Sequence, residues 1–304
     1  MVDKINGNIV CAYLYSITKY GYPPKASDTL SHMDEMIALG FSSIELEGIR
    51  EQHLMEVYAL KDDIAQKLVD ENIRVPYFCA VLPALSSLDE QVVNEQLALF
   101  EKACELGKTL GAFGILDNAP LPPFQFPQDI PIVRHYDEDV LNAAYLSKDI
   151  SWQKYWDQIV STYRTACEIA RDHDLNYVMH PAVGVLSSTT DGFLYFHDAV
   201  KMDNLRFNLD TANQFVMKEN LSLALRRLKD HVDYIHISDN GGSKVEHLAL
   251  QQGQIRWDVF FETLDVINFK GHIGIDIGGA ESAVAQLDDA YKEAAAFVTQ
   301  HWKG

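Results

Sequence analysis

The chain alternates between short apolar runs rich in β-branched residues and longer segments whose apolar residues recur at helical spacing. Eight such units can be placed in order along the 304 residues. Strands that alternate with helices are expected to be parallel and joined by crossovers. Eight units in a chain of this length favour one closed (β/α)8 TIM barrel over residues 1–304, and no GxGxxG motif follows the first run to support a dinucleotide-binding sheet. The predicted strands are Ile9–Tyr15, Ser43–Leu46, Arg74–Ala80, Phe113–Leu116, Tyr177–His180, Arg206–Leu209, Tyr234–Ile237 and His272–Ile277.

One long segment interrupts this alternation after the fourth predicted strand. Residues 117–150 contain five of the ten prolines, and the run 118–140 is expected to hold neither helix nor strand, because proline fixes φ and removes a backbone donor. Long loops inside compact domains are usually functional or disordered. We predict a lid or a pocket wall, with a subunit-contact arm as the alternative. Glycines are expected to end the helices elsewhere, at Gly40, at Gly107 with Gly111, and at Gly271.

Composition restricts the class of partner. The formal net charge of −19 argues against nucleic acid and anionic membranes, because phosphate groups need clustered Lys and Arg. The four cysteines are widely spaced, as expected for buried thiols in a reducing compartment. No apolar run is long enough for a membrane span, and the N-terminal residues lack a signal-peptide pattern. We therefore expect a cytoplasmic protein.

Metal-capable side chains recur at the ends of four successive predicted strands. They are His180 in "NYVMHPAVG", Asp210 in "LRFNLDTANQF", His236 in "VDYIHISDN" and Asp276 in "GHIGIDIGG". In a parallel barrel all four would meet at the C-terminal mouth, where such folds carry their chemistry. Imidazole and carboxylate ligands together suit Mn²⁺, Fe²⁺, Co²⁺, Ni²⁺ or Zn²⁺, and an open position would make the site catalytic. The alternative is a purely structural polar network.

The segments "LDTAN", "HISDN", "EHLALQQGQIRWDVFFETL" and "GHIGIDIGG" resemble the xylose-isomerase-like TIM-barrel superfamily of sugar isomerases and epimerases. The resemblance implies Glu, Asp, His and Glu ligands from strands five to eight. Asp210 and His236 match the middle pair, whereas His180 and Asp276 replace the two glutamates, and Asn213 replaces a histidine common in the family. It also implies a sugar or polyol substrate and a divalent metal, with Mn²⁺ expected first and Co²⁺, Zn²⁺, Fe²⁺ or Mg²⁺ as alternatives.

The departures from the family pattern leave three functions open. The first is an isomerase or epimerase that abstracts a proton next to a carbonyl through a metal-stabilised enediolate. The second is a lyase or dehydratase, because "HPAVG" resembles dehydratases of keto-inositols and lyase subunits that cleave 3-keto-C-glycosides. The third is a non-catalytic sugar-binding subunit, since the paired acid and base glutamates are absent. His135, His180 and Asp276 are the candidate bases.

Three further residues are candidate substrate ligands. Glu45 and Glu47 lie at the end of the second predicted strand, where alternation is expected to turn one of them into the mouth, and Glu47 is the candidate. Asp239 and His247 follow the seventh strand, with a turn-capping or structural role as the alternative for each. We expect a homo-oligomer, and the need for a small partner subunit is left open.

Overall fold

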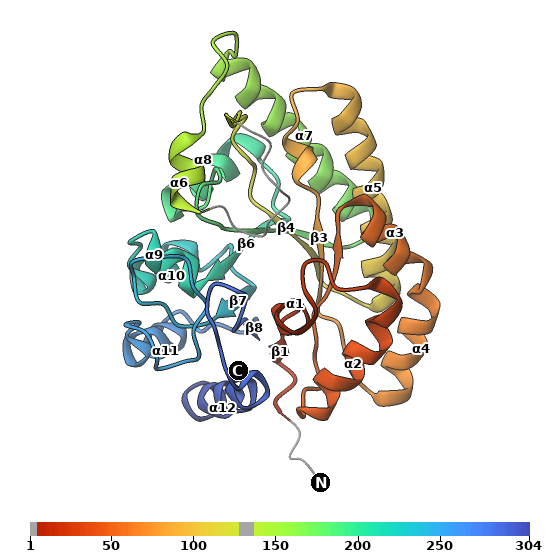
Figure 1. Ribbon diagram of the computed structural model, residues 1–304, viewed down its shortest axis with the longest axis vertical. Helices are drawn as coiled ribbons and strands as arrows, with labels where there is room; N and C mark the ends of the chain where they lie inside the picture. The colour runs from red at the N-terminus through yellow and green to blue at the C-terminus, as the bar shows by residue number, and fades with distance from the viewer. Residues whose placement is uncertain (1–4, 128–136) are drawn as a thin grey trace.

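The computed structural model describes residues 5–127 and 137–304, which form a ring of eight parallel strands surrounded by helices (Figure 1). Neighbouring strands follow the order β1-β8-β7-β6-β5-β4-β3-β2, so β2 to β8 each pair with their neighbours in sequence and β1 pairs with β8. The predicted barrel is confirmed. The strands are β1 (Ile9–Cys11), β2 (Leu46–Ile49), β3 (Tyr77–Val81), β4 (Gly114–Asn118), β5 (Asn176–His180), β6 (Leu205–Asp210), β7 (Tyr234–Ile237) and β8 (His272–Ile275).

The ring is closed by backbone hydrogen bonds between β1 and the residues just before β2. The Cys11 N–H donates to the Ser43 carbonyl at 3.0 Å, and the Glu45 N–H donates to the Cys11 carbonyl at 2.9 Å. Because no sheet edge is left open here, the strands can be buried on both sides, as their continuous apolar runs require.

Helices cover the outside of the ring and complete the expected strand-helix units (Figure 1). They are α1 (Leu14–Tyr20), α2 (Thr29–Ala38), α3 (Arg50–Ala59), α4 (Lys61–Glu71), α5 (Glu90–Leu110), α6 (Glu138–Ala143), α7 (Trp152–Asp172), α8 (Thr190–Val200), α9 (Thr211–Val216), α10 (Leu221–Leu228), α11 (Trp257–Val266) and α12 (Leu287–His301), with 3₁₀ turns η1 (Ala26–Asp28) and η2 (Pro83–Ser86).

Several predicted boundaries are wrong. The first strand stops at Cys11 and the chain enters α1 at Leu14, because a short buried apolar run has no periodicity that separates strand from helix. The second strand begins at Leu46, where it was expected to end, although residues 43–45 already pair with β1. Gly107 lies inside α5, and only Gly111, with φ +75°, ends that helix.

The proline-rich segment is partly regular. β4 extends to Asn118, and α6 occupies 138–143, so the expectation of no helix is wrong at the end of the run. α6 is possible there because the prolines precede it. The start of the segment is anchored to its neighbours: the Leu121 N–H donates to Ser86 Oγ at 2.9 Å, and the Leu186 N–H donates to the Pro120 carbonyl at 2.8 Å.

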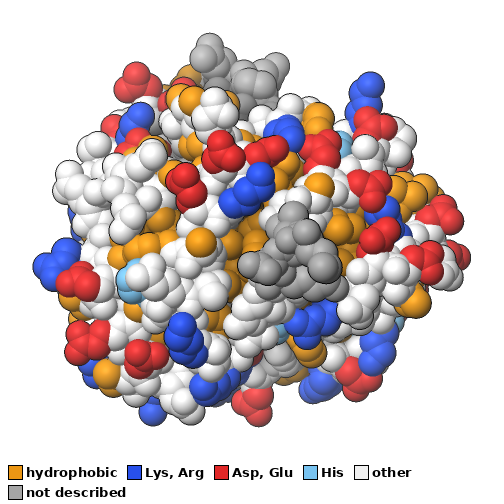
Figure 2. All heavy atoms as spheres, turned by 90° about the horizontal axis from the view of Figure 1, so that it is seen from below, with side chains coloured by type: hydrophobic (Ala, Val, Ile, Leu, Met, Phe, Trp, Pro, Cys, Tyr) orange, Lys and Arg blue, Asp and Glu red, His pale blue; other side chains and the backbone are white. Residues whose placement is uncertain are grey.

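The surface carries mixed charge. On the face shown in Figure 2, Lys and Arg lie among Asp and Glu and form no large basic patch, in keeping with the acidic composition. Across residues 5–127 and 137–304, no helix has both the length and the apolar character that a membrane crossing requires.

Candidate metal centre

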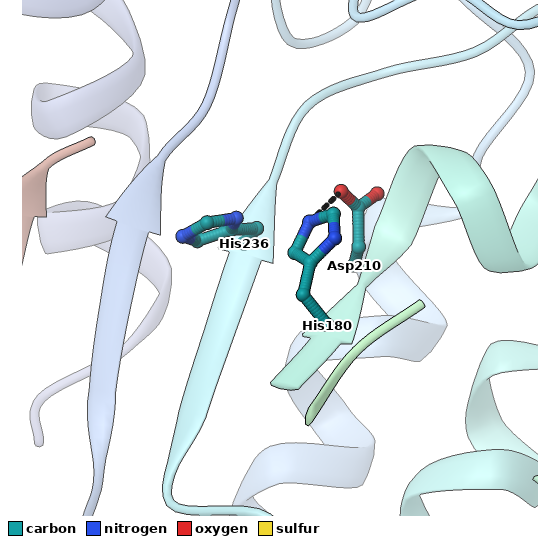
Figure 3. Close-up of side chains that lie close together, drawn as sticks. All are labelled: His180, Asp210 and His236. Carbon is teal, nitrogen blue, oxygen red and sulfur yellow. Dashed lines mark hydrogen bonds and ion pairs between the residues drawn. The ribbon is translucent and has the colours of Figure 1, made fainter. Parts of the chain in front are cut away.

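The ends of three adjacent strands bring His180, Asp210 and His236 together (Figure 3). His180 ends β5, Asp210 ends β6, and His236 lies in β7. One donor atom from each lies within 4.8 Å of the others, and His180 Nε2 is 3.2 Å from Asp210 Oδ2. Parallel strands end on the same rim of a barrel, so the predicted convergence of these residues follows directly from the topology.

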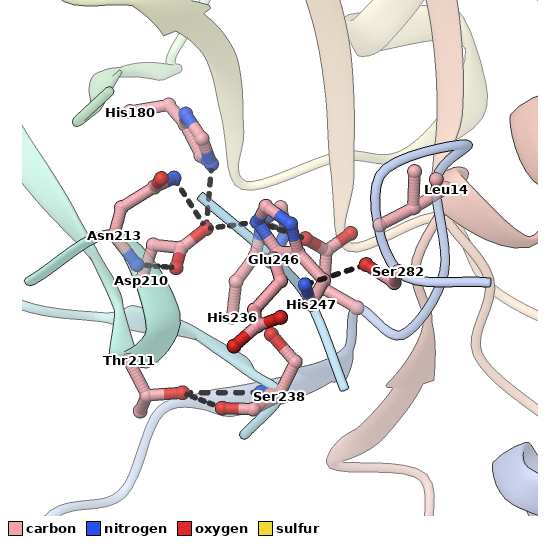
Figure 4. Close-up of polar contacts among 12 residues, drawn as sticks. Leu14, His180, Asp210, Thr211, Asn213, His236, Ser238, Glu246, His247 and Ser282 are labelled. Carbon is pink, nitrogen blue, oxygen red and sulfur yellow. Dashed lines mark hydrogen bonds and ion pairs between the residues drawn. The ribbon is translucent and has the colours of Figure 1, made fainter. Parts of the chain in front are cut away.

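A second group shares Asp210. Donor atoms of Asp210, His247 and Asp276 also lie within 4.8 Å of one another. His247 Nε2 is 3.6 Å from Asp210 Oδ2 and 3.8 Å from Asp276 Oδ2, and His236 Nδ1 is 3.9 Å from that same Asp276 oxygen. The two groups therefore meet at Asp210, and Figure 4 shows His180, Asp210, His236 and His247 beside one another.

The donor set fits a divalent transition metal. Donor atoms bonded to such an ion at about 2.1 Å lie roughly 3–3.5 Å from one another. The distances between donor atoms given above are close to that range. The buried Nδ1 atom of His236, which faces Asp276, has no hydrogen-bond partner among the described residues. Buried polar atoms are nearly always satisfied, so this nitrogen is suited to a ligand.

Glu45 orients His236 from below. Its Oε2 lies 3.0 Å from His236 Nε2 and accepts a hydrogen bond from the Tyr234 hydroxyl at 2.9 Å, while its Oε1 accepts from the Tyr13 N–H at 3.2 Å. The contact with Glu45 leaves His236 Nδ1 facing Asp276. Carboxylates that hold the far nitrogen of a ligand histidine are typical of metal sites.

Asp210 is fixed by Asn213. The Asn213 N–H donates to Asp210 Oδ1 at 2.8 Å, and the Asn213 amide donates to Asp210 Oδ2 at 3.0 Å. Asp210 thus caps α9 while its Oδ2 atom points toward His180 and His247 (Figure 4). Asn213, noted in the sequence only as a departure, therefore positions the central carboxylate.

His247 is held from several sides. Its N–H donates to Ser282 Oγ at 2.7 Å, its carbonyl accepts from the Gly278 N–H at 2.9 Å, and its Nδ1 is 3.3 Å from Glu281 Oε1. These contacts direct Nε2 between Asp210 and Asp276 and bury the ring completely. This position makes His247 a candidate metal ligand, and the substrate contact predicted from the sequence stays a prediction.

The charges of the centre are strongly coupled. Burial disfavours the charged form of His236, yet the carboxylates of Glu45 and Asp276 raise its pKa to about 9. Burial by itself would raise the pKa of Asp210, but hydrogen bonds and charge from His180 and His247 hold it well below its usual value. In the metal-free protein His236 is therefore protonated at neutral pH, and its positive charge partly offsets the negative charge of the surrounding carboxylates.

An open cavity of about 120 Å³ lies above the centre. His180, His236 and Asp276 line it, together with Glu47, Arg50 and Asn118. Leu121 also lines it, which places the beginning of the proline-rich segment in the cavity wall. A metal at this position would face this open cavity.

The two glutamates after the second predicted strand both face inward. Residues two apart in a strand share a face, so alternation does not separate them as expected, although only Glu47 of the two reaches the cavity. Glu45 lies deeper, against His236, and Glu47 lines the cavity. The two-residue spacing of Glu45 and Glu47 was the signal in the sequence that could have shown that Glu45 also points into the barrel.

Asp239 lies in the loop after β7, and its predicted role in binding substrate stays a prediction. It is fully buried and does not line the cavity. Its carboxylate accepts hydrogen bonds from the Gln251 N–H at 2.9 Å, the Ile255 N–H at 3.2 Å and Trp257 Nε1 at 2.9 Å. These bonds hold the loop between β7 and α11. The remaining candidate base, His135, lies outside the described residues.

Comparisons with known proteins support the fold. The protein resembles 3-keto-D-glucoside 4-epimerase from E. coli with a TM-score of 0.72 and 14% identity, over 97% of this chain and 100% of that one. The zinc-bound IolI protein gives 0.71 and 17%, over 97% and 99%. The probable 3-DHS dehydratase of petrobactin synthesis from Bacillus anthracis gives 0.69 and 14%, over 96% and 98%.

At these identities the structural likeness establishes the fold only. No protein of curated function matches the sequence. A family model described as xylose isomerase-like TIM barrel matches residues 33–301 and thus covers most of the chain. The chain belongs to the xylose isomerase-like TIM barrel family.

Proposed function

We propose that this protein is a divalent-metal-dependent isomerase or epimerase of a sugar or polyol, acting by proton transfer next to a carbonyl. The observation that carries the proposal is two groups of metal-capable side chains that share Asp210, one with His180 and His236 and the other with His247 and Asp276, beside the cavity. A metal bound by them would polarise the substrate carbonyl and offset the charge that develops on its oxygen. Mn²⁺ is our first choice.

Two side chains of the centre are placed to move protons. His180 and Asp276 both line the cavity and come from β5 and the end of β8, which lie on different sides of the ring. The one of the two that stays unbound to the metal would take a proton from the carbon beside the carbonyl and return it to a neighbouring carbon, because a histidine nitrogen bound to a metal has no free lone pair. Glu47 and Asn118, on the cavity wall, would bind hydroxyl groups and hold the carbon in place.

A lyase or dehydratase is the second candidate. An imidazole and a carboxylate are unequal acids, unlike the paired glutamates expected in the family, and an unequal pair suits removal of a proton and protonation of a leaving group. A structural neighbour described as a probable dehydratase shares the fold, which makes this chemistry compatible with the barrel.

The first test is metal content by mass spectrometry for protein purified without chelators, beside Asp210→Ala and His236→Ala. We expect near-stoichiometric metal in the wild type and its loss in both variants. If the wild-type protein binds no metal after reconstitution with Mn²⁺, Co²⁺ and Zn²⁺, the proposal is wrong.

The second test separates the reactions. Metal-loaded protein is incubated with keto sugars in deuterated water. Deuterium in a product of unchanged skeleton indicates isomerisation or epimerisation, whereas a new ultraviolet absorbance indicates elimination to an unsaturated product. Binding with neither signal points to a non-catalytic sugar-binding subunit.

A further inference from the structure

A second hollow lies between residues 23–27, which follow α1, and the beginning of α3. Its volume is about 460 Å³, larger than that of the cavity above the metal centre. Residues 23–27 contribute Pro23, Lys25 and Ser27 to its lining, and α3 contributes Arg50 and Glu56. None of the described residues of the proposed metal centre lines it. The hollow is therefore a candidate binding site separate from that centre.

Two cations in this hollow have no carboxylate partner. Among the residues that the structure describes, neither Lys25 nor Arg50 forms an ion pair, whereas Lys19, on the neighbouring α1, pairs with Glu35. The Arg50 guanidinium carbon lies 6.0 Å from the centroid of the Tyr22 ring. Stacking on a ring uses the face of a guanidinium group and leaves the N–H groups at its edge able to donate to a ligand.

The backbone of Arg50 is strained. Its φ of +57° lies in the left-handed region, which is unfavourable for a residue with a Cβ. His53 helps to hold this turn, because its Nδ1 accepts a hydrogen bond from the Ile49 N–H at 3.0 Å. Strained residues of this kind gather at sites of function. Arg50 lies on the boundary between two spaces, since it lines both the hollow and the cavity above the metal centre.

The backbone that carries Lys25 is also held in place. Two prolines precede Lys25 and fix φ at their positions. The Lys25 carbonyl accepts a hydrogen bond from the Asp28 N–H at 3.1 Å, and the turn η1, which begins at the next residue, is in contact with α3. Both cations therefore extend from a fixed backbone, which reduces the entropy that a ligand must remove on binding.

One acidic side chain also lines the hollow. Glu56 lies about 9 Å farther along α3 than Arg50, and its Oε1 accepts a hydrogen bond from Gln52 Nε2 at 2.9 Å. An anion placed beside Arg50 and Lys25 meets two positive charges at close range and the negative charge of Glu56 at longer range. The net interaction is attractive, and Glu56 weakens it.

A phosphate group matches this pair of cations. Near neutral pH a phosphate monoester carries between one and two negative charges, whereas a carboxylate carries one. The planar fork of an arginine pairs with two phosphate oxygens, and a lysine supplies a point charge from another direction. Two cations on different walls of one hollow therefore favour phosphate over a carboxylate.

We propose that the hollow between residues 23–27 and α3 binds a phosphate group, held by Arg50 and Lys25. The group comes either from inorganic phosphate or from a sugar phosphate whose sugar extends past Arg50 toward the cavity. The site needs no metal, so this inference goes beyond the proposed function and does not rest on it.

Calorimetric titration of the metal-loaded protein with inorganic phosphate tests this, after excess metal has been removed. Arg50→Gln should weaken binding by about tenfold or more, and Lys25→Gln by about threefold or more. Glu56→Gln should strengthen binding by about twofold, because it removes a repulsive charge. Lys229→Gln, at an exposed position after α10, removes an equal charge elsewhere and should leave the affinity unchanged.

Asp210→Ala separates this site from the metal centre. This variant should lose the metal and keep its affinity for phosphate. The proposal is overturned if the wild type binds no phosphate at millimolar concentration, or if phosphate binding is lost in Asp210→Ala. Equal affinities in the wild type and in folded Arg50→Gln and Lys25→Gln overturn it as well. Metal content, measured on each sample, reports independently on the proposed function.

Glucose 6-phosphate, fructose 6-phosphate and glucose, titrated in the same way, identify the source of the phosphate. A sugar phosphate that binds about tenfold or more tightly than inorganic phosphate assigns the site to sugar phosphates. Equal affinities for the sugar phosphates and inorganic phosphate assign it to inorganic phosphate. Glucose that binds as tightly as glucose 6-phosphate overturns the proposal, because the phosphate group would then contribute nothing.

Discussion

His236 Nε2 lies 3.0 Å from Oε2 of Glu45, a carboxylate buried beneath the barrel mouth. The contact fixes the ring so that Nδ1 is directed toward Asp276, 3.9 Å away. Glu45 therefore sets the orientation of a proposed metal ligand without lining the cavity itself.

Replacing Glu45 should weaken metal binding. Glu45→Gln keeps the shape of the side chain and removes the charge that orients His236, so we expect metal affinity to fall by about 10- to 100-fold. Glu47→Gln, two residues along, should leave metal affinity unchanged and weaken substrate binding instead. Competition with a chromophoric chelator measures the affinity of both variants for Co²⁺. Equal affinities in the two variants would contradict this assignment.

Metal affinity should rise with pH up to about pH 9. Glu45 and Asp276 raise the pKa of His236 to about 9 against the opposing effect of burial, so the metal-free protein holds a proton there at neutral pH. A metal must displace that proton, and binding should release it below pH 9. Titrations in buffers of different ionisation enthalpy count the protons released, and a pH-independent affinity between pH 7 and 9 would refute the assignment.

The raised pKa of His236 should also affect the stability of the metal-free protein. The folded pKa of His236 is above its ordinary value of 6.5, so its ion pairing contributes stability that is full below pH 6.5 and is lost as the pH rises through about 9. Metal-free protein should thus lose stability across this window, and metal-loaded protein should not. Urea unfolding at a series of pH values compares the two forms.

His247 should act as a metal ligand. Its Nε2 lies between the carboxylates of Asp210 and Asp276, so His247→Asn should lower Co²⁺ affinity by about 10- to 100-fold and change the visible absorption of bound Co²⁺, which reports coordination number. His197→Asn, on α8, is the control for loss of a histidine elsewhere. A reduced affinity with an unchanged Co²⁺ spectrum would mean that His247 acts only by positioning its neighbours.

Because of the buried carboxyl group of Asp117, the free energy of unfolding should decrease as the pH rises from about 4 to 7. Burial raises its pKa from 3.8 to about 7, against hydrogen bonds from the Leu82 N–H, the Tyr177 hydroxyl and the Asn118 N–H. The folded state binds the extra proton in this window, so stability is greatest below pH 4 and is lost toward pH 7, by roughly a few kcal/mol.

Asp117→Asn should remove this slope, because an amide oxygen can still accept from the two backbone donors and carries no charge. Urea midpoints of metal-free protein at pH 5, 6, 7 and 8 test the difference, with the exposed Asp149→Asn as the matched control. Parallel pH profiles for the wild type and Asp117→Asn would show that the Asp117 carboxyl keeps an ordinary pKa.

The sequence determined the barrel and the elements from which the centre is built. Strand-helix alternation depends on the local period of apolar residues, which can be counted without the fold. Parallel strands in a ring must end on one rim, and that topology was enough to predict that His180, Asp210, His236 and Asp276 meet. The ends of the strands could not be predicted as well. Leu14 and Tyr15 belong to α1 and not to the first strand, because a short buried apolar run has no periodicity that distinguishes strand from helix.

Only the tertiary structure decided the contacts between segments far apart in the chain. Glu45 and His236 are 191 residues apart, and no local pattern records that they touch. His247 and Asp239 lie in the same loop, yet one points at Asp210 in the proposed metal centre and the other anchors the loop to Trp257. Local sequence determines which atoms are available, whereas the direction of a side chain depends on packing against residues that only the folded chain brings near.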